Sequence, residues 1–276
     1  MKILIMKALG QIMIGSVAVI GLAVTACKKD AAKPKDEVVV PDTSSKYKLA
    51  WSDEFDGSTV NTKNWNFDTG HATSGWGNNE KQYYKAANAS IADGNLQITA
   101  RKDSTGADEY TSARMTTLRK YDFTYGKVEA RMKLPEGLGL WPAFWMLGSD
   151  MASVGWPKCG EIDIMERINN EIWISGAAHW DKAGHSASSK KINTTPTVYH
   201  VYGVEWDKEA IRWYIDGQLY HQVSTKDNAD DTDEFHKPFN ILLNLAVGGN
   251  WPGQIIDDTK LPAVMLVDYV RVYKEK

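Results

Sequence analysis

The sequence predicts an all-β domain built from two antiparallel sheets that pack face to face, as in a sandwich or jelly roll. Short segments alternate apolar and polar residues with the period of two that is typical of strands, and Gly, Asn and Pro lie between them. Long helical periodicity is absent after residue 27. The chain has 276 residues, 43% of them hydrophobic, which is enough for one large domain with a substantial core. We recognise neither an internal repeat nor a second folded domain.

Residues 1–27 predict a bacterial lipoprotein signal peptide. Lys2 and Lys7 precede an apolar stretch from Ile12 to Val24, which is too short for a comfortable membrane span. The stretch "VTAC" resembles a lipobox, in which Cys27 becomes the lipidated first residue of the mature chain. Plain cleavage would leave Cys27 as a lone exposed thiol, which makes little sense in an exported protein. We expect an exported lipoprotein held by its lipid anchor alone; the sequence leaves open the periplasmic or cell-surface face of the outer membrane.

Residues 28–46, "KKDAAKPKDEVVVPDTSSK", have the composition of a flexible tether without a packed core. The folded domain, residues 47–276, begins at "YKLAWSDEFDG" and ends after "VDYVRVY". Asp216-Gly217 lies between two alternating runs and predicts a tight β-hairpin. The other strand segments with clear alternation are "GNLQITARK" at 94–102, "GKVEARMKL" at 126–134 and "MLVDYVRVY" at 265–273.

Composition also limits the ligand. The net charge of −3, with both signs interspersed, lacks the basic field that a nucleic-acid binder needs. The 11 Trp and 12 Tyr favour a stacking surface for a flat, hydroxylated ligand in addition to a core. We expect Cys159 to be a small buried apolar residue on a strand and not a catalytic thiol. No nucleic-acid partner and no oligomer are expected.

The stretch "GEIDIMER", residues 160–167, places three acidic residues in an apparently buried strand. In a regular strand Glu161 and Asp163 share one face, and Glu166 points the other way, into the core. An unpaired carboxylate there costs several kcal/mol or becomes neutral. A β-bulge at Ile164-Met165 would shift the register and bring all three carboxyl groups to one face.

The spacing suggests a chemical use for this arrangement. With the bulge, the two glutamate Cα atoms lie about 13 Å apart and their leaning carboxyl groups about 6 Å apart. This separation is nearer to that of retaining glycosidases than of inverting ones, without excluding the latter. Asp163, between them, can hold the nucleophile by hydrogen bonding and raise the pKa of the acid by charge repulsion. Spacing alone does not tell which glutamate is the nucleophile.

Two other interpretations of the three carboxyl groups remain open. They could bind a metal, but His179 is the only histidine near them in sequence and hard cations usually take loop ligands. They could also form a solvated acidic face, although the apolar neighbours Ile162, Ile164 and Trp156 favour a lined cleft.

"GEIDIMER" resembles the E-I-D-x-x-E signature of family-16 glycoside hydrolases. The resemblance covers residues 47–276, with further matching stretches "NNEKQYY", "YTSARMTT", "YGKVEARMKLPEGLGLWPAFWML" and "FNILLNLAVGGNWPG". It implies a β-jelly roll with a concave substrate cleft and retaining hydrolysis of a β-linked glucan or galactan. By position, it implies that Glu161 is the nucleophile, Asp163 its assistant and Glu166 the acid/base, with no cofactor required for catalysis.

The longer E-I-D-x-x-E form is similar to that of laminarinases and of agar- or carrageenan-cleaving members, whereas lichenases have one residue fewer. "GWPKCGEIDIME", "YTSARMTT" and "GGNWPG" most resemble endo-β-1,3-glucanases, so a laminarin-type β-glucan is the expected substrate. "GAAHW" at 176–180 departs from the Thr-(hydrophobic)-His-Tyr of many laminarinases. Mixed-linkage glucan, galactan hydrolysis, transglycosylation and non-catalytic glucan binding remain alternatives.

Sugar-binding residues follow from the need for aromatic rings to stack on pyranose C–H faces and planar polar groups to bind hydroxyls. Two tryptophans at i and i+4 share a strand face, two more lie in Gly/Pro-rich loops, and three polar residues lie in matching motifs. These candidates are Trp141, Trp145, Trp156, Trp251, Asn79, Arg114 and His179. The resemblance also implies a structural Ca²⁺ on the convex side, bound by Glu54, the carbonyl of Gly94 and Asp268.

Overall fold

The computed structural model describes residues 46–103 and 109–276. The predicted signal peptide, including Cys27, and nearly all of the tether lie outside the described residues. Within the described part of the chain, no helix has both the length and the apolar character needed to cross a membrane. The first described strand, β1, begins at Tyr47, where the sequence places the start of the folded domain.

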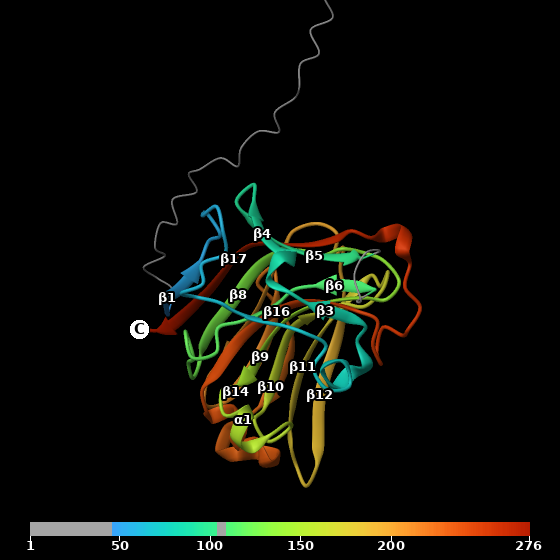
Figure 1. The fold of residues 1–276 in the computed structure, drawn as a ribbon. Helices are drawn as coiled ribbons and strands as arrows, with labels where there is room; N and C mark the ends of the chain where they lie inside the picture. The colour runs from blue at the N-terminus through green and yellow to red at the C-terminus, as the bar shows by residue number, and fades with distance from the viewer. Residues whose placement is uncertain (1–45, 104–108) are drawn as a thin grey trace, which may run out of the picture. The chain divides into compact units, whose positions relative to one another are not determined.

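Two sheets make up the domain (Figure 1). The larger has ten strands, eight of them in the order β15-β14-β13-β8-β17-β5-β6-β3, with β1 also on β17 and β4 also on β5. All its pairs are antiparallel except β3 with β6. Its strands are β1 Tyr47–Asp53, β3 Gln82–Tyr84, β4 Ala89–Ala92, β5 Asn95–Lys102, β6 Tyr110–Ser112, β8 Gly126–Lys133, β13 His200–Trp206, β14 Ala210–Ile215, β15 Gln218–Ser224 and β17 Ala263–Glu275.

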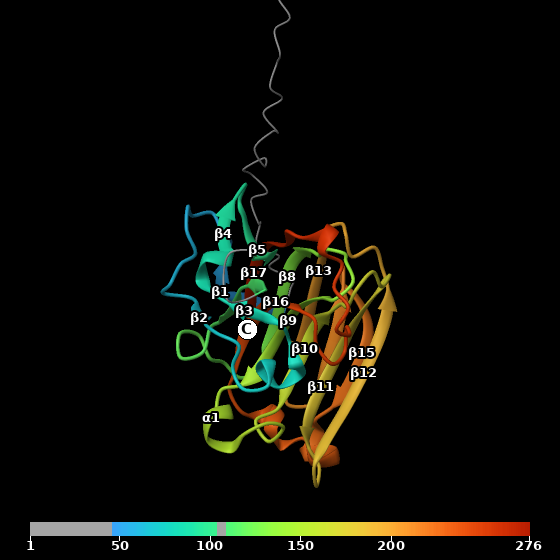
Figure 2. The same cartoon turned by 45° about the vertical axis from the view of Figure 1, so that its right-hand side comes forward.

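The smaller sheet has seven antiparallel strands in the order β12-β11-β10-β9-β16-β7-β2, and we call it the cleft sheet. Its two sides differ, since one packs on the larger sheet and the other carries the site described below. Figure 2 shows its edge strand β12 beside β15 of the larger sheet. Its strands are β2 Asn66–Asp68, β7 Arg114–Thr116, β9 Leu140–Gly148, β10 Glu161–Glu166, β11 Trp173–Asp181, β12 His185–Asn193 and β16 Phe239–Val247.

The core lies between the sheets and follows the period of two. On β9, Phe144 and Met146 are fully buried in it, whereas the alternate residues Trp141 and Trp145 are on the opposite side. The same alternation on β16 sends Ile241, Leu243 and Leu245 inward. The predicted sandwich of two sheets is therefore confirmed.

Turns and short helical segments join the strands. The predicted hairpin is present: Asp216 and Gly217, both with positive φ of 50° and 77°, connect β14 to β15. Helical segments in the described residues are at most six residues long: α1 Met151–Val154, Gly75–Asn79, Ala86–Asn88, Lys226–Asp231, Asp233–His236 and Asp258–Lys260. Cys159 is fully buried as expected, but it lies in the turn before β10 and not on a strand.

Candidate active site

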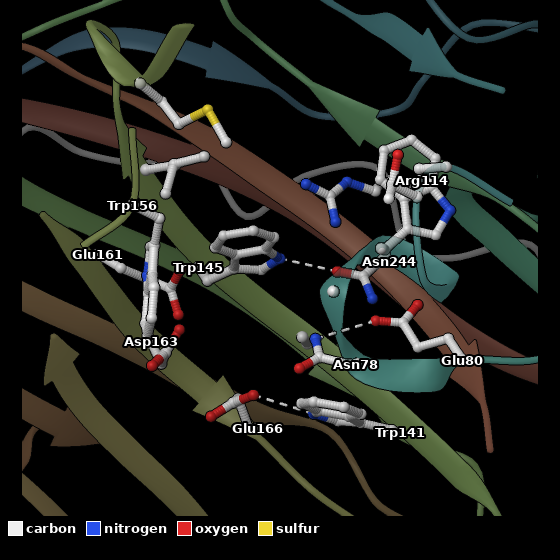
Figure 3. Close-up of a pocket in the computed structure, with 17 residues that line it drawn as sticks. Asn78, Glu80, Arg114, Trp141, Trp145, Trp156, Glu161, Asp163, Glu166 and Asn244 are labelled. Carbon is white, nitrogen blue, oxygen red and sulfur yellow. Dashed lines mark hydrogen bonds between the residues drawn. The ribbon is translucent and has the colours of Figure 1, made fainter. Parts of the chain in front are cut away.

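A cavity of about 590 Å³ opens on the outer side of the cleft sheet (Figure 3). β9 and β10 supply its floor, and the segments around residues 72–80 and 151–156 add walls. Residues predicted to act together line it from separate parts of the chain: Arg114, Trp141, Trp145, Trp156, Glu161, Asp163 and Glu166. The remaining lining includes Trp76, Asn78, Glu80, Met151 and Asn244.

The predicted bulge in β10 is what brings the three acidic residues together. Against β9, Asp163 pairs with Trp145 and Met165 with Phe144, so Ile164 is the extra residue. Against β11, two residues, Ile164 and Met165, occupy the interval between the pairs made by Asp163 and Glu166. Ile164 and Met165 are both fully buried in the core. Two successive inward side chains shift the register, and Glu166 therefore points into the cavity.

Glu161 and Asp163 form one half of the acidic group. His179, paired with Glu161 across β10 and β11, places its Nε2 3.1 Å from Asp163 Oδ2. One carboxylate oxygen of Glu161, one of Asp163 and one ring nitrogen of His179 lie within 4.8 Å of one another. The other ring nitrogen of His179 lies 2.8 Å from His185 Nε2, and Trp156 packs against both imidazoles.

Glu166 forms the other half and has its own partner. Its Oε1 accepts a hydrogen bond of 2.9 Å from the indole Nε1 of Trp141 (Figure 3). Burial, followed by the negative charges of Asp163 and Glu161, raises the pKa of Glu166 well above its ordinary value. The predicted charge repulsion from Asp163 is thus present, but removal from water is the larger cause.

Burial also raises the pKa of Glu161, to about 8, with the charge of Asp163 as the second cause. His179 and Arg114 oppose this shift and lower the pKa of Glu161. Burial raises the pKa of Asp163, and hydrogen bonding with Glu161 opposes this shift without cancelling it. Burial is the largest cause that raises the pKa of each of the three carboxyl groups, and the side chains of Glu161 and Glu166 remain half-buried. His179 lowers the pKa of both glutamates, whereas Arg114 appears only among the causes that favour the anion of Glu161.

The wall facing the acidic group is aromatic and polar. The guanidinium of Arg114 lies between the rings of Trp76 and Trp145, 4.7 and 4.9 Å from their centroids. Asp68 fixes it through a 2.9 Å hydrogen bond from Arg114 Nε. Trp145 in turn donates to Asn244 Oδ1 at 2.7 Å. Trp145 is therefore held in place from two directions.

A buried carboxyl group that we did not single out from the sequence, Glu80, also lines the cavity. It accepts hydrogen bonds from Asn78, Gln82 and Tyr84 at 3.2, 2.7 and 3.1 Å. Burial raises its pKa above the ordinary value, and these bonds together with the charge of Arg114 oppose the shift. Its place in "NNEKQYY", beside the predicted Asn79, was the available sequence signal.

Asn79 itself lies outside the cavity lining, and its neighbour Asn78 lies inside. Asn79 is exposed, with φ of 55°, and donates to Asn250 at 2.8 Å. The left-handed turn rotates successive side chains in opposite directions, which sequence spacing could not reveal. Trp251 is also absent from the immediate lining but continues it, with its ring 5.5 Å from that of Trp141.

The two carboxylates predicted for calcium are engaged in ion pairs. Arg271 donates two hydrogen bonds to Glu54, at 3.0 and 2.8 Å, and Arg131 donates one to Asp268 at 2.7 Å. Gly94 has the positive φ of a tight turn before β5. A cation here would compete with arginines for the two carboxylates, so this donor set does not by itself favour Ca²⁺. Calcium binding stays a prediction.

A β-sandwich whose bulged strand presents two glutamates and an aspartate in an aromatic cleft defines a glycosidase by fold and by site. The model of the family described as "Glycosyl hydrolases family 16" matches residues 76–271, and the chain belongs to this family.

Similar proteins cover most of the chain. The "Beta-glucanase" of Rhodothermus marinus is 41% identical over 251 residues, which are 84% of this chain and 87% of that protein. The crystal structure of laminarinase from Flavobacterium sp. UMI-01 has 39% identity and a TM-score of 0.76, covering 82% of this chain and all of that one. The "Clotting factor G alpha subunit" of Tachypleus tridentatus is 39% identical over 233 residues, 83% of this chain. This chain spans only 34% of that relative's length.

Proposed function

We propose that the protein is an endo-acting β-glucanase that cleaves internal β-1,3 linkages of laminarin-type glucan with retention of configuration. The observation that carries the proposal is the bulge in β10, which places Glu161, Asp163 and Glu166 in one cavity lined with tryptophans. A non-catalytic glucan-binding protein has no need for a buried acid with a strongly raised pKa beside a second glutamate.

In the proposed first step, Glu166 donates its proton to the glycosidic oxygen while the Glu161 carboxylate attacks the anomeric carbon. The bond to the leaving sugar breaks, and a covalent glycosyl ester forms on Glu161. Glu166, now ionised, then takes a proton from water, whose oxygen displaces Glu161 from the anomeric carbon. Asp163 and His179 lie beside Glu161, where they can orient its carboxylate. No cofactor takes part.

The proposed substrate rests on the longer E-I-D-x-x-E form and on the similarity to a β-glucanase and a laminarinase. Trp141, Trp145 and Trp156 offer stacking faces for successive pyranose rings, and Arg114, Asn78 and Glu80 offer polar groups for hydroxyls. A cavity that offers three tryptophan faces fits cleavage within a polymer.

The direct test is incubation of the purified chain from residue 28 with laminarin, mixed-linkage β-glucan, agarose and carrageenan, followed by assay of reducing ends. We expect release from laminarin and its loss in Glu161→Gln. Proton NMR of the first products should show the β-anomer, and detection of longer transfer products would reveal transglycosylation. Cleavage of agarose alone would overturn the substrate and keep the mechanism. If no polymer releases reducing ends, the proposed enzymatic activity is refuted.

We further propose that Cys27 carries a lipid that anchors the protein to the membrane as an exported lipoprotein. The support is the charged start, the short apolar stretch and "VTAC" in the sequence. Cells given an alkyne-tagged fatty acid should label the wild-type chain and not Cys27→Ala. Labelling of both variants alike would contradict the anchor.

A further inference from the structure

The bulge in β10 has a counterpart on β11. Ala177 pairs with Asp163 and Ser175 with Glu166, so Gly176 alone stands opposite Ile164 and Met165. A Cβ atom on Gly176 would lie 2.5 Å from Cδ1 of Trp213 and closer still to the hydroxyl of Tyr220. The absence of a side chain at Gly176 is thus what lets these two rings from the larger sheet approach the cleft sheet.

Trp213, on β14, uses this space to reach the backbone of the bulged strand. Its Nε1 donates a 2.7 Å hydrogen bond to the carbonyl oxygen of Asp163, the residue just before the extra one. Trp213 is fully buried, and the bond crosses from one sheet to the other. A buried carbonyl beside an interrupted row of backbone hydrogen bonds needs such a partner. The rigid indole holds this carbonyl in one position.

We propose that Trp213 and Gly176 are positioning residues that hold the catalytic bulge in register. The inference rests on the proposed glycosidase function and adds to it two residues that touch no substrate. Without the bond to the Asp163 carbonyl, the extra residue can move along the strand, and a slip of one residue turns Glu166 away from the cavity. Loss of Trp213 therefore acts on the relative placement of Glu161 and Glu166 and not on the tryptophans that bind sugar.

The test compares two tryptophans that have the same local chemistry. Trp206, on β13, is also buried and donates Nε1 to a backbone carbonyl, that of Phe235, at 2.8 Å. Phe235 lies in the segment Asp233–His236 and not on the bulged strand. Trp213→Phe and Trp206→Phe each keep an aromatic ring and lose one indole hydrogen bond, so each loses a comparable amount of stability.

We expect Trp213→Phe to lower kcat on laminarin at least tenfold with KM within twofold of wild type, measured well below the melting temperature of each variant. Trp206→Phe should keep kcat within twofold. Equal losses of kcat in both variants, or an unchanged kcat in Trp213→Phe, would overturn the positioning role.

Gly176→Ala provides a second variant should Trp213→Phe fail to fold. Its matched control is Gly203→Ala on β13, where a Cβ would meet the Val128 carbonyl at 2.8 Å, away from the bulge. We expect kcat to fall in Gly176→Ala and not in Gly203→Ala. If the wild type cleaves no glucan, the proposed function fails, and crystal structures decide the inference separately. A displaced Asp163 carbonyl in Trp213→Phe supports it, and an unchanged bulge refutes it.

Discussion

At the scale of single residues, the two glutamates proposed as nucleophile and acid have unequal surroundings on one strand. Burial and two neighbouring negative charges raise the pKa of Glu166, and the hydrogen bond from Trp141 opposes this shift. Arg114 lowers the pKa of Glu161, and His179 lowers the pKa of both glutamates. Sequence spacing treats the two positions as equivalent, and the structure supplies the difference through neighbours from β7 and β9.

This division predicts a specific defect in Glu166→Ala. We expect kcat on laminarin to fall by about 10²–10⁴-fold, because no group remains to protonate the leaving oxygen. On an aryl β-glucoside oligomer with an acidic phenol, which needs no proton, the first step should survive, and added azide should restore turnover as a β-glycosyl azide. Glu161→Ala should instead yield an α-glycosyl azide. The reverse pattern would exchange the two assignments.

At the scale of elements, the strand pattern predicted more of the site than its loops. The failure of alternation at Glu166 was enough to predict the bulge, because a charged side chain in the core is so unfavourable. Trp141 and Trp145 followed from the same period of two. Asn78 and Glu80 did not, because their directions depend on left-handed turns at 74–79. Trp213 could not be found either, since its partner lies 50 positions away on another sheet.

Deletions within β10 test which face of the strand carries each carboxyl group. Removing Met165 leaves E-I-D-I-E-R, in which simple alternation keeps all three carboxyl groups on the cleft face. We expect a folded protein with kcat lowered by about ten- to a hundredfold, since the carboxyl spacing changes. Removing both Ile164 and Met165 sends the second glutamate into the core and should abolish folding. Circular dichroism and laminarin assays on the two variants measure this, and equal behaviour would contradict the face assignment.

At the scale of the whole molecule, the first strand connects the start of the domain to its end. β1 pairs with β17 from Tyr47 to Asp53, and Trp51 stacks on Tyr121 with ring centroids 5.0 Å apart. Asp53 accepts a 2.9 Å hydrogen bond from the buried Trp65. β1 thus ties the start of the predicted domain to its last strand.

Truncation tests that boundary. A chain starting at residue 47 should melt within about 2 °C of one starting at residue 28, since residues 28–46 have the composition of a tether. A chain starting at residue 54 loses β1 and the Trp51 packing, and its melting temperature should fall by about 10 °C or more. Scanning calorimetry measures all three. A large loss on removing residues 28–46 would place part of the folded domain before Tyr47.

The acidic cleft also affects the stability of the whole molecule. A carboxyl group whose pKa is raised on folding stabilises the protein fully only below its unfolded pKa, and this stability is lost as pH rises through the folded value. For Glu161 that window runs from about 4.3 in the unfolded chain to about 8 in the folded one. Glu161→Gln removes the ionisable group and keeps its shape.

We therefore expect the free energy of unfolding of Glu161→Gln to exceed that of wild type by about 1–3 kcal/mol at pH 8. Near pH 4 the two free energies should be equal. This free-energy difference is smaller than the full pKa shift of Glu161 would give, because the Glu161 side chain opens on the cavity. Lys102, on the far end of β5, provides a control: Lys102→Gln also removes one charge and should show no such pH-dependent gain. A gain for Glu161→Gln that is the same at both pH values would assign the effect to packing. Urea titrations at the two pH values distinguish these outcomes.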